Sequence, residues 1–366
     1  MPKLQEGTQT KMISIASPDI GDEEKKAVLE VLSSGIIAEG PKVKEFEQRF
    51  AEYCGTKHAV AVSSGTAALH VALLAHGIGP GDEVITTPFT FIASANSVLF
   101  TGAKPVFCDI VEDTFNIDPD LLAEKITKNT RAIMPVHLFG HPAEMKAVME
   151  LAKDHGLLVV EDACQAHGAQ YGGKKVGSFG TGCFSFYPTK NMTSSEGGMI
   201  TTDDPEVERK ARAIRQHGMF KRYYHEMLGF NLRMTDIAAA IGLVQLRKLP
   251  EYNRKRIRNA EMLSEKVRNM ALTLPKVREG CVHVFHQYTI RCTARDAAVK
   301  TLGDKGIGCG VYYPVPVHKQ PYYLSIGYNE SHPVAEKAAS EVFSVPVHPK
   351  LSDSDLKRIA EVLNTL

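Results

Sequence analysis

An excess of charge of one sign is missing from this sequence. The 366 residues contain 43 lysines and arginines against 42 aspartates and glutamates, which leaves a formal net charge of +1. Proteins that bind nucleic acids usually carry a clear basic excess, so the composition gives no electrostatic reason to expect a nucleic-acid partner. The basic run at 254–258 is therefore interpreted as a solvated helix face.

Paired cysteines and long apolar runs are also missing. The seven cysteines are odd in number, widely spaced and never arranged as C-x-x-C, which argues against a disulfide framework and against a zinc site. No apolar run is long enough to cross a bilayer, and the polar opening Met1–Lys11 has no apolar core for a signal peptide. We therefore expect a cytoplasmic protein with reduced cysteines, no metal and no membrane partner.

The sequence does contain an alternation of short β-rich runs with amphipathic helical runs. The apolar runs at 132–136 and 157–160 are continuous, as is typical of strands that are buried on both faces. Strands alternating with helices predict an α/β fold with a mostly parallel sheet covered by helices.

The length of the chain leaves room for two domains. A large α/β domain is predicted at 1–249 and a smaller C-terminal α+β domain at 250–366. The boundary is placed at Pro250, because this proline is predicted to separate a helix at 236–249 from another at 254–270.

The first candidate site is the segment Ser63–Leu69, which follows a predicted strand and opens a predicted helix. Free backbone N–H groups and the helix dipole at such a position favour an anion. Gly65 lets a phosphate approach the backbone, and the hydroxyls of Ser64 and Thr66 offer further hydrogen bonds. Capping of the helix by Ser64 explains the same residues, so the segment alone leaves both interpretations open.

The second candidate site is the segment Val159–His167, which places Asp162 at the carboxyl end of a buried strand. Open α/β sheets bind ligands at this end, and an unpaired carboxylate there would be costly. A protonated ring nitrogen is a suitable partner, because it would make the ring an electron sink. By itself, the segment is explained more simply by Asp162 capping a helix and Glu161 carrying a surface charge.

The third candidate site is the segment Ser185–Gly198, in which Lys190 follows a strand and Pro188 and precedes a pair of glycines. A lysine amine forms an imine with an aldehyde, above all where its pKa is lowered. An ordinary surface lysine is the alternative. The chain between Asp162 and Lys190 is long enough for one hairpin or crossover, so both residues can line one pocket.

Further segments complete a pattern that covers most of the chain, from about Gly35 to His348. Any one segment is a weak signal, but their order and spacing together are specific. The segments are Ser64–Leu69, Thr87–Phe91, Glu161–Gly168, Ser185–Asn191 and Gly229–Asp236, with a weaker one at Tyr312–His318. Together they resemble the DegT/DnrJ/EryC1/StrS family of pyridoxal-phosphate-dependent sugar aminotransferases. The resemblance implies a type I aminotransferase fold, with a seven-stranded, mostly parallel sheet in the large domain.

The resemblance also implies a role for each matching residue around the cofactor ring. Lys190 would bond to the aldehyde of pyridoxal 5′-phosphate and move the proton during transfer. Asp162 would pair with the ring nitrogen, and Gln165 would lie near the ring and its 3-oxygen. Phe91 would stack on the other face of the ring, although a core aromatic is an equal alternative.

The phosphate and the substrate would be held by a second set of residues. The resemblance implies that Gly65, Thr66 and Ser185 hold the phosphate. It also implies that Asn231 reaches the phosphate of the partner subunit's site in a homodimer with shared active sites. For Asn231 the alternative is a turn residue after Gly229. His318 and Tyr313 would lie near the sugar, with a purely structural histidine as the alternative for His318.

The reaction implied by the resemblance moves an amino group from an amino acid, usually L-glutamate, to a keto group of a nucleotide-linked sugar. The cofactor would pass through its pyridoxamine form, and the product would serve a surface polysaccharide or a secondary metabolite. Ser195 departs from the glycine common in the family, which puts only the loop shape in doubt. The family's dehydratase branch has histidine at the position of Lys190, and this chain does not.

Two other functions remain open from the sequence. One is a lyase or desulfurase of the same fold, although Cys164 and Cys183 are not in an obvious mobile loop. The other is a non-catalytic protein that senses the cofactor or a nucleotide sugar. A nicotinamide site is poorly supported, because no G-x-G-x-x-G follows the first predicted strand.

Overall fold

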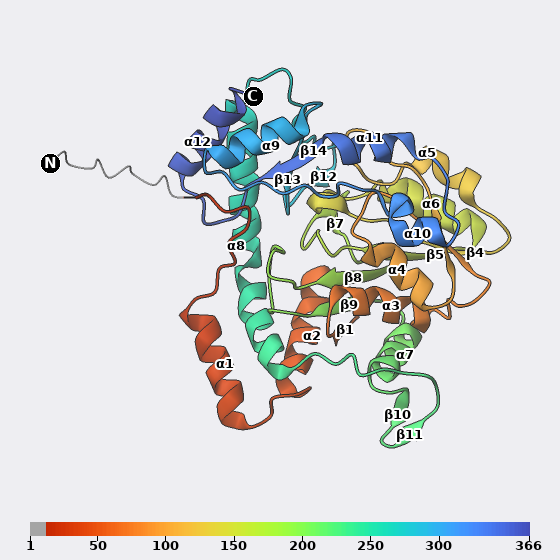
Figure 1. Ribbon diagram of the computed structural model, residues 1–366. Coiled ribbons are helices and arrows are strands. Elements are labelled where there is room, and N and C mark those ends of the chain that lie inside the picture. The colour runs from red at the N-terminus through yellow and green to blue at the C-terminus, as the bar shows by residue number, and fades with distance from the viewer. Residues whose placement is uncertain (1–11) are drawn as a thin grey trace.

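The computed structural model describes residues 12–366, so Met1–Lys11 and the prediction made for them lie outside the described residues. A central sheet flanked by helices occupies one part of the molecule, and a smaller group of helices and strands occupies another (Figure 1). Among the described residues, none of the helices is long and apolar enough to cross a bilayer.

The central sheet has seven strands in the order β1-β9-β8-β5-β4-β2-β3. Neighbouring strands from β8 to β3 pair in parallel, and β9 pairs antiparallel with both β8 and β1. The prediction of a mostly parallel seven-stranded sheet is confirmed. The strands are β1 (His58–Val62), β2 (Glu83–Thr86), β3 (Lys104–Phe107), β4 (Thr130–Ile133), β5 (Leu158–Asp162), β8 (Thr181–Ser185) and β9 (Gly198–Thr202).

Both faces of this sheet are buried, as strand β1 illustrates. Val60 and Val62 pack on one face against α3 (Gly65–Ala75) and α7 (Pro205–Arg215). Ala59 and Ala61 pack on the other face against α2 (Pro41–Cys54) and the long helix α8 (Asp236–Lys266). Because successive side chains of a strand point to opposite faces, burial of both sets accounts for the continuous apolar runs in the sequence.

Helix α8 differs from its prediction, because Pro250 lies inside one continuous helix of 31 residues. A proline within a helix removes one backbone hydrogen bond and normally bends or ends it. Here the residues before Pro250, such as Leu246 and Leu249, are packed in the core of the sheet domain. Ala260 and Leu263, after Pro250, are packed in a second core. Burial on both sides of the proline holds the two halves as one helix.

The second core gathers the C-terminal elements around the end of α8. Strands β13 (Tyr288–Arg291) and β14 (Val342–Val345) form an antiparallel pair covered by α9 (Arg295–Asp304) and α12 (Asp353–Leu363). Ile13 also belongs to this core and forms a bridge with Ile307, so the start of the described chain packs with its end.

Shorter elements complete the fold. They are α1 (Asp22–Ser34), α4 (Ala93–Phe100), α5 (Pro119–Leu122), α6 (Met145–His155), α10 (Pro321–Ser325), α11 (Pro333–Glu341), β6 (Gln170–Tyr171), β7 (Lys174–Lys175), β10 (Met219–Lys221), β11 (Tyr224–His225) and β12 (Cys281–Val282), with 3-10 turns at Ala123–Lys125, Leu138–Gly140 and Val317–Lys319.

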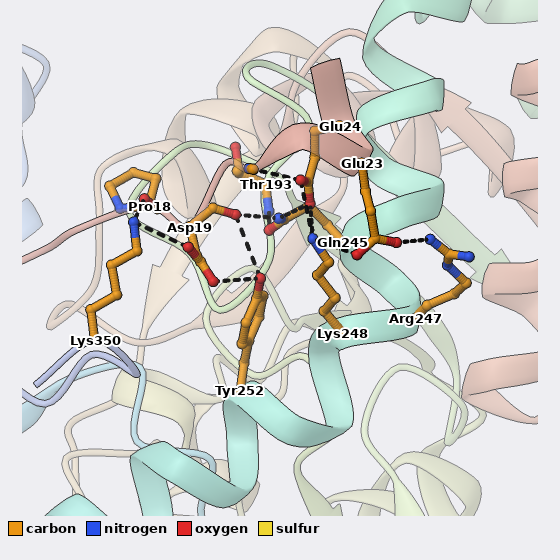
Figure 2. Close-up of polar contacts among 11 residues, drawn as sticks. Pro18, Asp19, Glu23, Glu24, Thr193, Gln245, Arg247, Lys248, Tyr252 and Lys350 are labelled. Atoms are coloured by element: carbon orange, nitrogen blue, oxygen red, sulfur yellow. Dashed lines mark hydrogen bonds and ion pairs between the residues drawn. The ribbon is translucent and has the colours of Figure 1, made fainter. Parts of the chain in front are cut away.

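A polar cluster fastens the N-terminal segment to α8 (Figure 2). Gln245 lies at its centre. Its Nε2 donates to the backbone oxygen of Asp19 over 2.7 Å and to Glu24 Oε1 over 2.8 Å, and its Oε1 accepts the backbone N–H of Thr193 over 3.4 Å. Lys248 Nζ donates to the same Glu24 oxygen over 2.9 Å. The cluster therefore connects the start of the described chain to the loop that also carries Lys190.

Candidate active site

A cavity of about 600 Å³ lies beside the carboxyl ends of the parallel strands β2, β5 and β8. This is the end at which open α/β sheets bind ligands. The residues that line the cavity are Ser64, Gly65, Thr66, Leu69, Thr90, Phe91, Ala93, Ser94, Val136, Phe139, Asp162, Cys164, Gln165, Ser185, Tyr187, Thr189, Lys190, Glu196, His286, Gln287, Tyr312 and Tyr313. Segments from both cores of the protein thus meet around one space.

Asp162 is the last residue of β5 and is only 5% exposed. Ser94 Oγ donates to its Oδ2 over 2.6 Å, and the backbone N–H of Cys164 donates to its Oδ1 over 3.2 Å. A buried carboxylate that accepts such bonds is held in one orientation. No helix begins after Asp162 in the structure, so the helix-cap interpretation is wrong.

Glu161 is fully buried and is not the surface charge that its segment suggested. Its carboxylate accepts the backbone N–H groups of Gly177, Phe179 and Gly180 over 2.7 to 2.9 Å, and it lies 3.1 Å from His137 Nε2. These donors fix the turn before β8 next to β5, and so they help to set the place of both strand ends.

Lys190 lies in the loop after β8. Its backbone N–H donates to Tyr187 O over 2.9 Å, and the next residue, Asn191, donates from Nδ2 to Asn253 Oδ1 and to Val284 O, each over 2.9 Å. These bonds fasten the loop to helix α8 and to the segment that precedes β13. The loop is therefore held by two segments that lie far from it in the chain, which limits the movement of Lys190.

The environment of Lys190 changes the acidity of its ammonium group. Burial lowers the pKa of Lys190 below its ordinary value of 10.5, and the nearby Cys164 and Asp162 oppose this effect. Desolvation disfavours the charged form of an amine, so a larger fraction is unprotonated at neutral pH than for an exposed lysine. An unprotonated amine is the form that attacks an aldehyde.

The start of helix α3 forms another wall of the cavity. Ser64 caps the helix by accepting the backbone N–H of Ala67 over 3.1 Å, so the capping interpretation is confirmed. Gly65 lies so close to β8 that a Cβ atom there would be 2.6 Å from Ser185 Cβ and 3.0 Å from Cys164 Sγ. Only glycine, which has no Cβ, allows α3 to begin this close to β8. The free backbone N–H groups of the first turn of α3 are available to an anion.

Gln165 and Tyr313 connect opposite walls of the cavity. Gln165 Nε2 donates to Tyr313 Oη over 3.0 Å, while its Oε1 accepts the backbone N–H of Phe139 over 2.8 Å. The ring of Phe91, 54% exposed, lies 6.0 Å from the ring of Tyr313. Phe91 is thus a cavity residue, and the alternative of a core aromatic is wrong.

Two predicted residues lie outside this cavity, although Asn231 is predicted to contact the site of the partner subunit and not the site of its own chain. Asn231 is exposed and does not line the cavity of its own chain. His318 is fully buried outside the cavity, where its Nε2 lies 3.0 Å from Glu336 Oε1 and its ring lies 4.7 Å from that of His332. Its Nε2 is engaged by Glu336 and its side chain is fully buried outside the cavity, so the geometry favours the structural alternative over contact with the sugar.

Several cavity residues carry no recognisable signal in the sequence. Ser94, the hydrogen-bond donor to Asp162, stands in α4 with no motif to mark it, although it follows the segment Thr87–Phe91 by a few residues. Glu196 was read only as part of a glycine-containing turn. His286 and Gln287 precede β13 and come to the cavity from the second core. Nothing local in the sequence distinguishes them from packing residues.

The residues of the cavity fit pyridoxal 5′-phosphate. The group requires an amine for its aldehyde, a carboxylate for its ring nitrogen and donors for its phosphate. Lys190, Asp162 and the first turn of α3 with Ser185 supply these chemistries around one cavity, and the space kept by Gly65 is where a Cβ would obstruct the phosphate cradle. The predicted contacts Gly65, Thr66, Phe91, Asp162, Gln165, Ser185, Lys190 and Tyr313 all line this cavity.

Comparison with known proteins gives consistent matches over nearly the whole chain. The family model of the DegT/DnrJ/EryC1/StrS aminotransferase family matches residues 18–364. A pleiotropic regulatory protein of Geobacillus stearothermophilus is 46% identical over 91% of this chain and 91% of that protein. UDP-N-acetyl-3-dehydro-α-D-glucosamine 3-aminotransferase of Acidithiobacillus ferrooxidans is 42% identical over 93% of each.

Solved structures agree with the sequence matches. The crystal structure of DesV from S. venezuelae has a TM-score of 0.92 and 42% identity, covering 94% of each chain. The pyridoxal-phosphate form of the putative sugar aminotransferase Spr1654 from Streptococcus pneumoniae has a TM-score of 0.91 and 30% identity, covering 97% of this chain and 98% of that one.

Proposed function

Because the chain belongs to the DegT/DnrJ/EryC1/StrS aminotransferase family, we propose that Lys190 is its catalytic lysine and Asp162 the partner of the cofactor's ring nitrogen. The protein is a pyridoxal-phosphate-dependent transaminase that moves an amino group to the keto group of a nucleotide-linked sugar in aminosugar biosynthesis. The observation that supports these roles is that Lys190 and Asp162 line one cavity at the carboxyl ends of the parallel strands.

Lys190 and Asp162 have different roles in proton transfer. Bound in the cavity, pyridoxal phosphate supplies an aldehyde and a ring that accepts electrons. Because burial lowers the pKa of Lys190, its Nζ is available to take a proton from the substrate carbon. The carboxylate of Asp162, held by Ser94, favours the positive charge that Nζ then carries and keeps the ring nitrogen protonated. In the half-reaction with the amino donor, Nζ would then give the proton to a different carbon, the former aldehyde carbon of the cofactor, and not to the carbon from which it came.

The other cavity residues orient the reactants. Gly65 and Thr66 in the first turn of α3, together with Ser185, would hold the phosphate. Gln165 has its amide fixed between Phe139 and Tyr313, so it presents a fixed edge towards the ring and its 3-oxygen.

We further propose a homodimer in which each chain completes the site of the other. Among the described residues, Lys190 is the one lysine or arginine that lines the cavity, whereas Asp162 and Glu196 add negative charge. The cofactor phosphate, the diphosphate of the substrate and the carboxylates of an amino acid are all anionic, so one chain supplies too few cations and donors. The exposed Asn231 is free to reach the phosphate in a partner's site.

The function is tested by supplying the purified holoenzyme with L-glutamate, the donor we propose, and keto-sugars linked to UDP, dTDP or GDP. Mass spectrometry and NMR of the products should show one aminated sugar and the position of its new amine. A holoenzyme that converts none of these sugars, while its cofactor also stays unchanged by glutamate, would contradict the proposal.

Sharing of the site is tested by mixing two inactive variants. Chains with Lys190→Ala and chains with Asn231→Ala, denatured and refolded together, would form mixed dimers with one intact site, so part of the activity should return. Each variant refolded alone is the control. Failure of the mixture to regain activity, with mixed dimers demonstrated by mass, would show that Asn231 acts within its own chain.

We also propose that the enzyme works in the cytoplasm. All seven cysteines are unpaired in the structure, which suits a reducing compartment.

A further inference from the structure

Glu196 is a carboxylate in the cavity that the proposed reaction does not use. It lines the cavity and is exposed, unlike the buried Asp162. Asp162 accepts hydrogen bonds from Ser94 and Cys164, but the carboxylate of Glu196 receives no hydrogen bond or ion pair from any residue between 12 and 366. Its acceptor oxygens are therefore available to a ligand.

The backbone that carries Glu196 is fixed, although its carboxylate is free. Ser194 Oγ donates to Glu196 O over 2.8 Å, and the backbone N–H of Phe186 donates to Gly197 O over 2.9 Å. Ser195 has a φ of +74°, and a Cβ at Gly197 would lie 2.5 Å from Ser194 Oγ, so the turn has little freedom. The turn thus presents the carboxylate at a set place beside the end of β8.

The charge of Glu196 decides which ligand groups it can meet. A carboxylate only accepts hydrogen bonds, and it repels phosphates and other carboxylates. The cofactor phosphate, the diphosphate of the substrate and the acid groups of glutamate are therefore unsuitable partners. The neutral hydroxyl groups of a sugar ring are suitable, because they donate short bonds to a carboxylate, which can accept two of them at once.

The position of Glu196 agrees with this assignment. Asp162 and Gln165 are buried at the inner wall of the cavity, whereas Glu196 is exposed together with Tyr187. The inner wall is taken by groups that suit the cofactor. The exposed part of the cavity is left for the substrate that enters from solvent.

We propose that Glu196 binds the hydroxyl groups of the sugar ring and so selects the sugar part of the substrate. This inference rests on the proposed function. It predicts that Glu196 contributes favourably to the affinity for a nucleotide-linked sugar and makes no favourable contribution to the affinity for the nucleotide alone.

The experiment measures binding without turnover. In its pyridoxamine form the holoenzyme cannot transfer an amino group to a sugar that already has one. Amino sugars linked to UDP, GDP and dTDP are therefore titrated calorimetrically into this form, and UDP, GDP and dTDP are titrated in parallel. The variants are Glu196→Ala, Glu196→Gln and the control Glu279→Gln, which changes an exposed carboxylate outside the cavity.

The expected result is specific to the sugar. Loss of hydrogen bonds to a charged group should weaken binding of the preferred amino sugar by about tenfold or more in Glu196→Ala. Glu196→Gln should lie between that variant and the wild type, because it keeps an oxygen acceptor without the charge. Binding of the free nucleoside diphosphates should not weaken in any variant, and Glu279→Gln should match the wild type throughout.

Several results would overturn the inference. Wild-type affinity for the amino sugars in Glu196→Ala would do so, as would an equal loss of affinity for the free nucleoside diphosphates. A wild-type enzyme that bound no amino sugar more tightly than its nucleoside diphosphate would do so too. A dimer that dissociates in Glu196→Gln while keeping its sugar affinity would assign Glu196 to the contact between subunits instead.

Failure of the inference is distinguishable from failure of the proposed function. The half-reaction with L-glutamate, followed by the absorbance of the cofactor, does not involve the sugar and should be retained in Glu196→Ala. If the wild-type enzyme lacks this half-reaction, the proposed function is wrong. If it has the half-reaction and Glu196→Ala binds sugars normally, only the role of Glu196 is wrong.

Discussion

Gln165 donates a hydrogen bond of 3.0 Å from its Nε2 to Tyr313 Oη, and the two residues are 148 positions apart in the chain. Gln165 follows strand β5 of the central sheet, whereas Tyr313 belongs to the C-terminal part of the chain. The bond uses the phenol oxygen as acceptor and leaves the phenol hydrogen for a group in the cavity. One bond therefore spans the cavity and sets the orientation of both side chains.

Replacing Tyr313 by phenylalanine tests this bond. The variant Tyr313→Phe leaves a buried amide N–H of Gln165 without its acceptor, which should lower the free energy of unfolding by about 1–3 kcal/mol. Urea denaturation of the holoenzyme measures the change. Tyr322→Phe is the control, because Tyr322 is 59% exposed. Equal stability of the two variants would mean that the bond between Gln165 and Tyr313 contributes nothing.

The lowered pKa of Lys190 predicts an unusually reactive amine. At a given pH below 10.5, a lysine of lower pKa has a larger unprotonated fraction, so Lys190 should react faster than an exposed lysine. Lys25 is the internal reference, because its hydrogen bond with Asp22 raises its pKa. Acetylation of the cofactor-free enzyme at a series of pH values, with peptide mapping by mass spectrometry, gives both titration curves. A midpoint for Lys190 at or above that for Lys25 would contradict the assignment.

Replacing Lys190 itself separates chemistry from folding. In Lys190→Ala, borohydride reduction of the holoenzyme should label no lysine, whereas the wild type should be labelled at Lys190 alone. The circular dichroism spectrum should be unchanged, because the side chain faces the cavity and makes no hydrogen bond with any residue from 12 to 366, whereas the loop is fastened through Asn191. Labelling of another lysine in the wild type would remove the basis of the mechanism.

The space beside Gly65 predicts a loss of cofactor affinity on adding one methyl group. In Gly65→Ala, the new Cβ would lie 2.6 Å from Ser185 Cβ, so α3 and β8 must move apart where the phosphate is expected. Loss of even one charge-assisted hydrogen bond should weaken pyridoxal-phosphate binding by roughly tenfold or more. Gly79→Ala is the matched control, since a Cβ at this position would lie 3.9 Å from its nearest atom, the backbone oxygen of Thr101, which is an ordinary contact distance. Titration of the cofactor-free proteins, followed by absorbance, compares the two variants.

His167 predicts a specific dependence of stability on pH. Burial, assisted by the charges of Lys190 and Arg256, lowers its pKa from 6.5 to about 3. Between these values the unfolded chain binds a proton at this histidine and the folded chain does not, so stability falls as the pH falls from 6.5 towards 3. The slope from one such group is at most about 1.4 kcal/mol per pH unit.

The variant His167→Phe should remove the contribution of His167 to the dependence of stability on pH, because phenylalanine does not titrate. Phenylalanine can also pack beside Phe184 and Phe186. Denaturation measured at pH 7 and at pH 5 should show a smaller loss of stability in the variant than in the wild type. An unchanged difference between the two pH values would show that His167 is protonated in the folded protein.

Much of the fold was predictable from the sequence because it is encoded locally. The continuous apolar runs predict strands where β4 and β5 lie, and the small and apolar residues after Ser64 predict a helix where α3 lies. Asp162 and Lys190 were predicted to act in the site because each lies at or after the end of a strand within a motif that resembles the family's. Residues a few positions apart are enough to specify such elements, so periodicity and motif order could be read without a structure.

Other features were decided only by the tertiary structure. Pro250 stays within one helix because packing on two cores outweighs the local penalty of a proline. Glu161 is buried because distant backbone N–H groups surround it, and His318 is turned away from the cavity by Glu336. Each of these outcomes depends on contacts with residues far away in the chain, which no local sequence pattern predicts.

The site shows the same division. By itself, the sequence determined that an amine, a carboxylate and the glycine-containing start of a helix each lie at or shortly after the end of a strand, because these places follow from local pattern and chain order. Only the tertiary structure decided that Ser94, 68 positions from Asp162, orients the carboxylate and that Glu196 is left free. Hydrogen bonds act over about 3 Å in space, whatever the separation along the chain, so these choices exist only once the chain has folded.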